Sequence, residues 1–146
     1  MKSVAQLLAA KPDRAVHAIA PTASVLEAAE LMERHNIGAL LVLDGERVAG
    51  IVSERDLARK MIVSGRSPRD TPVRDIMQAK VHCVHTSHTN EDCMALMTDK
   101  RLRHLPVLDQ GKLVGLVSIG DLVKDTISEQ QFIIEQLEHY IAGERS

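Results

Sequence analysis

The stretch GALLVLDGERVAGIVSERD (residues 38–56) recurs in the same pattern as RHLPVLDQGKLVGLVSIGD (residues 103–121). The match continues without a gap over residues 16–57 and 81–122, so that residue 16 falls on residue 81. Identical residues include the pairs Leu40/Leu105, Val42/Val107, Gly50/Gly115, Ser53/Ser118 and Asp56/Asp121. Upstream, Val4, Leu7 and Leu8 match Val73, Ile76 and Met77 in another register, so the first copy has a few extra residues near Pro12–Ala15. The fold therefore consists of two equivalent units.

Each copy is predicted to run strand, helix, strand, strand, helix. The first strands are expected at Val16–Ile19 and Val81–Val84, and the first helices follow the capping pairs Ser24/Glu27 and Thr89/Asp92. In the first copy the next two strands are expected at Ala39–Leu43 and Val48–Val52.

Short turns and serines complete each predicted copy. Asp44-Gly45 is predicted to join two strands of the first copy in a tight hairpin, because both residues tolerate positive φ. The second copy uses Asp109-Gln110-Gly111, and the closing helices begin after Ser53 and Ser118.

One such unit is too small to bury its sheet alone, so the two copies must pack together. We expect an α/β (α+β) fold in which two β-α-β-β-α repeats form a pseudo-twofold pair with flanking N-terminal and C-terminal helices. The expected boundaries are a helix and linker over 1–15, the first repeat over 16–63, a connector with a short helix over 64–80, the second repeat over 81–125 and a C-terminal helix over 126–146.

Composition narrows the classes of function. Aromatic residues make up 1% of the chain and the formal net charge is -2, so the sequence offers neither stacking platforms nor a basic surface for nucleic acid. No apolar run approaches the roughly 20 residues that span a bilayer. The N-terminus lacks the core of a signal peptide, and the two cysteines have no disulfide framework. We expect a cytoplasmic protein with neither a nucleic-acid nor a membrane partner.

The run Gly-apolar-Val-Ser-x-x-Asp ends the last strand of each copy and has the chemistry of a nucleotide site. Backbone N–H groups at the start of a helix attract phosphate, a serine hydroxyl can add a hydrogen bond, and an aspartate can accept both ribose hydroxyls. Ser53, Asp56, Ser118 and Asp121 are the candidates, and Arg55 adds a phosphate partner in the first copy alone. The alternative is that Ser-x-x-Asp is only a helix cap.

The repeat resembles a CBS domain, and the pair resembles a Bateman module. The resemblance covers about residues 3–125 and rests on VRDIM (73–77), RHLPVLD (103–109) and both Gly-x-x-Ser-x-x-Asp runs. It implies a regulatory, non-catalytic protein that requires no cofactor and binds AMP, ADP, ATP, NAD or S-adenosylmethionine in clefts between two sheets.

The resemblance also implies roles for particular residues. Asp56 and Asp121 would hold ribose, and Ser53 and Ser118 would lie near phosphate. Adenine would be gripped by the backbone of the segments Ile37, Gly38, Ala39 and Leu102, Arg103, His104, while His17 and His82 would line the slot. Sequence leaves open which copy supplies these groups to which aspartate. The first copy has Leu41 where the family often has a proline, which departs from the adenine-binding pattern.

Two other chemistries are weighed against this interpretation. A cluster of possible zinc or copper ligands occurs at His82, Cys83, His85 and His88, but neighbours on a strand point to opposite faces, so no metal site is expected. No catalytic motif is present, and Cys93 lies on the apolar stripe of a helix, where a thiol is usually inert. We therefore expect no enzymatic activity.

The C-terminal tail carries apolar residues at helical spacing, at Val123, Ile127, Ile134, Leu137 and Ile141, with Phe132, Ile133 and Tyr140 beside them. It could dock on its own module or on a second chain, and the resemblance implies a homodimer. The sequence thus predicts a sensor of adenine nucleotides that acts through conformational change on an unknown protein. The alternative is a nucleotide-independent scaffold for interaction or dimerisation.

Overall fold

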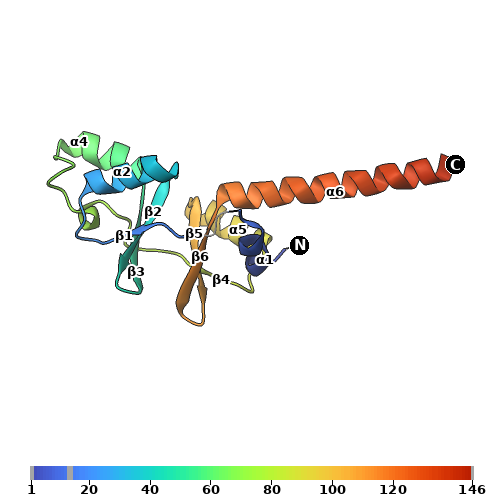
Figure 1. The fold of residues 1–146 in the computed structure, drawn as a ribbon, viewed down its shortest axis with the longest axis horizontal. Coiled ribbons are helices and arrows are strands. Elements are labelled where there is room, and N and C mark those ends of the chain that lie inside the picture. The colour runs from blue at the N-terminus through green and yellow to red at the C-terminus, as the bar shows by residue number, and fades with distance from the viewer. Residues whose placement is uncertain (1, 13–14, 146) are drawn as a thin grey trace.

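The computed structural model describes residues 2–12 and 15–145, with side chains to residue 139. The first repeat contains β1 (Ala18–Ile19), α2 (Val25–His35), β2 (Ala39–Asp44) and β3 (Arg47–Ser53), and the second contains β4 (Val84–His85), α5 (Asn90–Lys100), β5 (His104–Asp109) and β6 (Lys112–Ser118). The N-terminal helix α1 is Val4–Ala10 and the C-terminal helix α6 is Ile119–Arg145. This mixed fold of two three-stranded sheets confirms the predicted fold class (Figure 1).

The two sheets have the same topology and register. In each, a short first strand runs parallel to the central strand, which pairs antiparallel with the third. A β-bulge falls after Val42 in one central strand and after Val107, its repeat equivalent, in the other. The two sequence repeats therefore share even a local irregularity of the backbone.

Three details differ from expectation. β1 and β4 are shorter than predicted, because only Ala18–Ile19 and Val84–His85 form ladder pairs with the central strands. In the first hairpin Gly45 has a φ of 63° and Asp44 does not enter the positive region, so the glycine alone provides the positive φ. The closing helix of the first repeat is interrupted, since α3 (Glu54–Asp56) and α4 (Ile62–Ser64) flank a π-helical turn at Leu57–Met61.

Both predicted helix starts are capped, but only the second has the full predicted box. Ser24 accepts a hydrogen bond from the Glu27 N–H at 3.1 Å, without the reciprocal bond from the Glu27 side chain. Thr89 and Asp92 form a reciprocal box, with Thr89 N–H donating to Asp92 at 2.9 Å and Asp92 N–H donating to Thr89 at 3.2 Å. These bonds satisfy donors that a helix start would otherwise leave unpaired.

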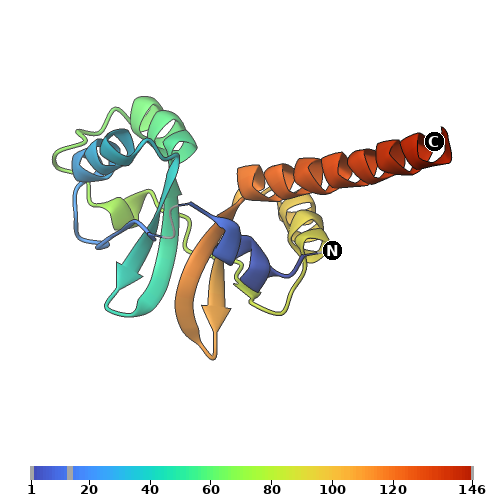
Figure 2. The ribbon, with the colours of Figure 1, turned by 45° about the vertical axis from the view of Figure 1, so that its right-hand side comes forward.

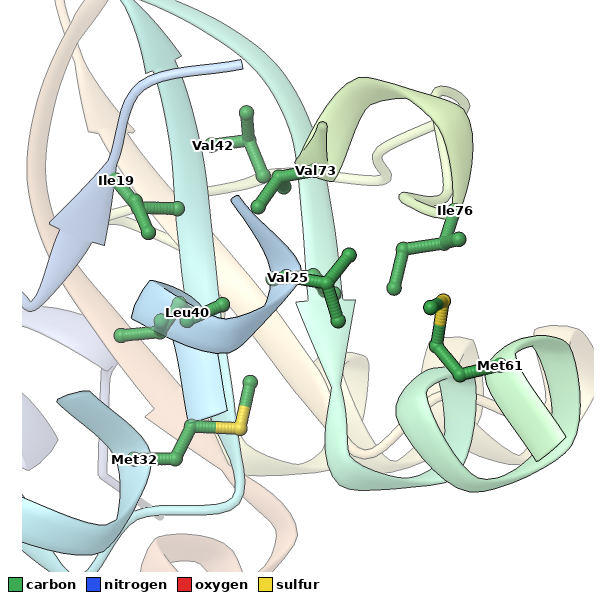
Figure 3. Close-up of a cluster of buried hydrophobic side chains, with 10 residues drawn as sticks. Ile19, Val25, Met32, Leu40, Val42, Met61, Val73 and Ile76 are labelled. Atoms are coloured by element: carbon green, nitrogen blue, oxygen red, sulfur yellow. The ribbon is translucent and has the colours of Figure 1, made fainter. Parts of the chain in front are cut away.

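Each repeat has its own hydrophobic core, and each core is completed by the segment that leads into the other repeat. The core of the first repeat includes Val73 and Ile76, which precede the second repeat (Figure 3). The core of the second includes Val4 and Leu7 of α1, which precede the first. The connector contributes Val73 and Ile76 through a short 3-10 helix at Val73–Asp75. The chain thus crosses over twice between the two halves.

The repeated glycine explains this close packing. A Cβ placed on Gly50 would lie 2.6 Å from Met77 Sδ and 2.8 Å from the Gln78 carbonyl oxygen, and one on Gly115 would lie 2.7 Å from Leu8 Cδ2. At Gly50 the Gln78 backbone would have to shift, whereas at Gly115 the Leu8 side chain would have to move. The glycine of the repeated motif therefore lets the crossing segment pack closely against the strand.

The opposite faces of the two sheets are also covered. Leu41 and Pro106 are fully buried, although neither belongs to the core beneath its own helix. Since side chains alternate along a strand, both lie on the face away from that helix. These faces lie between the repeats, as Figures 1 and 2 show.

The long C-terminal helix extends away from both sheets (Figure 2). The side chains of Tyr140 and Ile141, two of its predicted apolar positions, lie outside the described residues. Within the described chain, neither this helix nor any other is both long and apolar enough to cross a membrane.

Candidate functional site

Two clefts lie where the central strands begin, and each is lined by both repeats. The first cleft has a volume of about 280 Å³ and joins Ser53, Arg55 and Asp56 of the first repeat to Leu102–His104 of the second. The second has a volume of about 380 Å³ and joins Ser118 and Asp121 of the second repeat to a set from the first, namely His17, Ile37, Gly38 and Ala39. Both volumes are near the lower end of the range for small-molecule sites, roughly 300–1,000 Å³.

The lining of the clefts shows which segments lie together. The loop that precedes the central strand of one repeat shares a cleft with the Ser-x-x-Asp turn of the other. Gly38 and His104 line both clefts, so the two cavities adjoin at these residues. His82 lines neither of them, although its repeat equivalent His17 lines the second cleft and stacks on His35 with ring centroids 3.9 Å apart.

Hydrogen bonds within each repeat fix the Ser-x-x-Asp turns. The Glu54 N–H donates to the Gly38 carbonyl at 3.0 Å, and the Ile119 N–H donates to the Arg103 carbonyl at 2.9 Å. The helix start and the segment before the central strand are therefore tied together in the same way in both halves. Each turn is held at the mouth of its cleft by the sheet beneath it.

Asp56 is almost enclosed in the first cleft. Its side chain is 6% exposed. One carboxylate oxygen accepts the Ser53 N–H at 2.9 Å and the Ser53 hydroxyl at 3.0 Å. The other accepts a bond from Gln78 Nε2 at 3.3 Å and lies 3.5 Å from Lys60 Nζ. The carboxylate is therefore a helix cap in this state.

The side chain of Asp121 is more accessible than that of Asp56, at 21% exposed, but it forms an ion pair with a lysine. Its Oδ2 accepts the Ser118 N–H at 2.8 Å and lies 2.9 Å from Lys11 Nζ, which also donates to the Leu116 carbonyl at 2.8 Å. Burial raises the pKa of Asp121, but the Ser118 hydrogen bond and the Lys11 ammonium outweigh it and hold the pKa below its ordinary value.

Positive charge gathers in both clefts. Arg55, Arg101 and Arg103 line the first, and Lys11 and Lys124 line the second. Guanidinium and ammonium groups at such a site attract phosphate or carboxylate. The arrangement can thus hold an anion beside an acidic group in each cleft.

His104 lies between these charges, where the clefts adjoin. Burial lowers its pKa most strongly, Lys11 and Arg103 lower it further, and Asp121 opposes them. The imidazole is therefore neutral at physiological pH and can both donate and accept a hydrogen bond. It is a neutral, polar side chain that lines both clefts.

Several residues that line the clefts were missed by sequence reasoning. Gln78 and Arg101 line the first cleft and Lys11 and Lys124 the second. The only available signal was the upstream repeat register, which pairs Lys11 with Lys80. That signal does not single out Lys11, because Lys80 is absent from the lining of both clefts.

The arrangement of the described side chains does not support the metal-binding or the nucleophilic alternative. Among the residues that the structure describes, no group of three or more His, Cys, Asp or Glu side chains is placed to hold a metal ion. His85 and His88 instead take part in a local turn, where His88 Nδ1 accepts the His85 N–H at 2.8 Å. Burial, with a smaller contribution from Asp92, raises the pKa of Cys93 to about 11, so its thiol is protonated at neutral pH.

Two repeats that share paired clefts define the class of protein as a tandem-repeat module with candidate ligand sites between its halves. The CBS domain family matches this chain twice, over residues 4–63 and 73–127. The chain therefore belongs to the CBS domain family, which confirms the resemblance seen in its motifs.

Relatives and solved structures agree. The mitochondrial CBS domain-containing protein CBSX3 of Arabidopsis thaliana is 39% identical over 125 residues, which are 82% of this chain and 61% of the plant protein. YhcV of Bacillus subtilis is 34% identical over 115 residues, covering 79% of this chain and 81% of that protein. The chain thus spans less than two thirds of the plant relative and most of the bacterial one.

The solved structure of a protein with CBS domains from Burkholderia ambifaria is 53% identical, with a TM-score of 0.86, and the match covers 88% of this chain and 96% of that one. Two more distant structures share the fold at 22% identity. PAE2072 of Pyrobaculum aerophilum, solved with AMP, has a TM-score of 0.73 over 82% of this chain and 89% of that one. Hypoxic Response Protein I, solved with two zinc ions, has a TM-score of 0.71 over 86% of this chain and 99% of that one.

Proposed function

We propose that this chain is a cytoplasmic sensor that binds an adenine nucleotide (AMP, ADP, ATP or NAD) in the clefts between its CBS repeats. The observation that carries the proposal is that both repeats line each cleft. A ligand held there contacts both halves, so its binding energy favours one packing of the repeats over another. That shift is the signal that a downstream protein reads.

The chemistry of the clefts suits a nucleotide. The arginines of the first cleft and the lysines of the second would bind phosphate, and Asp56 and Asp121 would accept ribose hydroxyls. The AMP bound by the Pyrobaculum protein supports an adenine ligand for this fold. Because the Asp56 side chain is 6% exposed, a ribose hydroxyl can reach it only if a neighbouring side chain such as Gln78 moves, which makes ligand binding and local rearrangement one event.

The test is calorimetric titration of the protein with each nucleotide, repeated on Asp56→Asn and Asp121→Asn. Asparagine keeps an oxygen for the capping N–H but loses the charge and one acceptor. Asp92→Asn is the matched control, because Asp92 makes the same capping box away from the clefts. We expect weaker binding in the cleft variants and unchanged binding in the control.

A second candidate, a scaffold that binds no nucleotide, is favoured by one observation. Both cleft aspartates already have hydrogen-bond partners, and the side chain of Asp56 is 6% exposed. In that case Asp56→Asn and Asp121→Asn would lower stability as Asp92→Asn does. None of the four nucleotides would then raise the melting temperature of the unmodified protein.

A further inference from the structure

The helix α6 leaves its own module after its first two turns. Near its start, Leu122 is fully buried and Asp125 is 7% exposed. Asn90 Nδ2 anchors this part by donating to the Leu122 carbonyl at 3.2 Å and to Asp125 Oδ2 at 2.7 Å. From residue 127 to residue 139 every side chain is exposed, and Figures 1 and 2 show the helix running clear of both sheets.

A helix in this position gains little stability from its own module. In proteins most helical stability comes from packing of an apolar face rather than from intrinsic propensity. The projecting segment contains Ile127, Ile133 and Ile134, and β-branched side chains lose rotamer freedom in a helix. Its stability must come from packing against something outside the described chain.

One apolar seam runs along the helix and has the spacing of a coiled coil. Val123, Ile127, Gln130, Ile134 and Leu137 are separated alternately by four and three residues. This places Ile127 and Ile134 at the a positions of a heptad and the other three at d. Their exposed fractions include 53% for Ile134 and 57% for Leu137.

The pattern selects a second copy of the same chain as the occupant. Within parallel coiled coils, isoleucine at a with leucine at d favours two strands, and Ile127, Ile134 and Leu137 follow that pattern, while Gln130 is the one polar residue of the seam. In a parallel pair the e-position Glu138 faces the g-position Ile133 of the other copy, so like charges do not oppose each other beside the seam. We propose that α6 pairs in parallel with α6 of a second copy through this seam.

The first experiment measures the mass of the full chain by analytical ultracentrifugation. We expect a dimer at micromolar concentration for the unmodified protein and a monomer for the double variant Ile134→Glu/Leu137→Glu. The dissociation constant should rise by at least on the order of a hundredfold, the effect of removing two central anchors. Phe132→Glu is the matched control, because Phe132 is 61% exposed on the opposite face of the same helix.

Two results would overturn the seam. The first is that the unmodified protein is still a monomer at a concentration of about 100 μM, where even weak pairs form. The second is that the control variant dissociates as readily as the seam variant. Thermal unfolding of each variant checks that its two repeats still fold. We expect them to fold, because the mutated side chains belong to neither hydrophobic core.

A second experiment tests the orientation. One variant carries Ile127→Cys and another carries Leu137→Cys. Both also carry Cys83→Ser, which removes the partly exposed native thiol. In a parallel pair each variant cross-links to itself, because every residue meets its own copy. Cross-linking only in a mixture of the two variants would overturn the parallel arrangement. The proposal does not depend on nucleotide binding, so each can fail without the other.

Discussion

Removal of the ion pair between Lys11 and Asp121 should destabilise the fold in a way that acid abolishes. Lys11→Met loses a charged hydrogen bond to Asp121 at 2.9 Å and a second bond to the Leu116 carbonyl at 2.8 Å, with both side chains less than a quarter exposed. Hydrogen bonds to charged groups contribute about 1.5–3 kcal/mol. We therefore expect Lys11→Met to lower the free energy of unfolding by about 2 kcal/mol at pH 7.

A double-mutant cycle with Asp121→Asn separates this pair from the other effects of each change. Urea unfolding should give a coupling energy of about 1–2 kcal/mol at pH 7. The folded pKa of Asp121 lies below its ordinary value of 3.8, so its contribution is complete above that pH and declines as the pH falls through the lower folded value. The exposed pair Arg47 and Asp44, 3.7 Å apart, is the control and should show no measurable coupling. A coupling below about 0.5 kcal/mol at pH 7 would refute the reasoning, as would one that persists unchanged in acid.

Three further predictions follow from packing and burial. Gly50→Ala should destabilise the protein by about 1–3 kcal/mol, because the new methyl group overlaps Met77, and a change of less than 0.5 kcal/mol in urea unfolding would contradict this. Leu105→Ala, at a fully buried position, should cost about 2–5 kcal/mol, and the midpoint of thermal unfolding measures it. Cys93 should resist a thiol reagent at pH 7.5 in the folded protein and react in urea, whereas the partly exposed Cys83 should react first; rapid modification of Cys93 before unfolding would argue against its burial.

Sequence alone predicted the repeated architecture because the signals for it are local. Alternating apolar residues, glycine-containing turns and the caps at Ser24 and Thr89 are read from neighbouring positions, and the structure confirms these elements and caps. The positions of both Ser-x-x-Asp turns were also evident, since the same repeat register defines them. The structure places those turns at the clefts, and their role in binding stays a prediction.

The residues themselves did not reveal which of the predicted groups share a cleft, because that depends on how the repeats cross. Which loop meets which aspartate is decided by the packing of two sheets, and no local pattern encodes it. Lys11 reaches Asp121 only because α1 packs on the second repeat. The π-helical turn at Leu57–Met61 likewise was not foreseen from the repeat, since the second repeat continues there as a regular α-helix.

The double crossover of the leading segments has a consequence for the origin of the fold. Val4 and Leu7 complete the core of the second half, and Val73 and Ile76 complete the core of the first. Two identical single-repeat chains would reach the same arrangement by exchanging their leading segments, as in a domain-swapped dimer. Gene duplication and fusion of such an ancestor would preserve every contact and remove only the need for two chains to meet. Co-expressed fragments cut within residues 64–70 should accordingly reassemble, each supplying the piece that the other lacks.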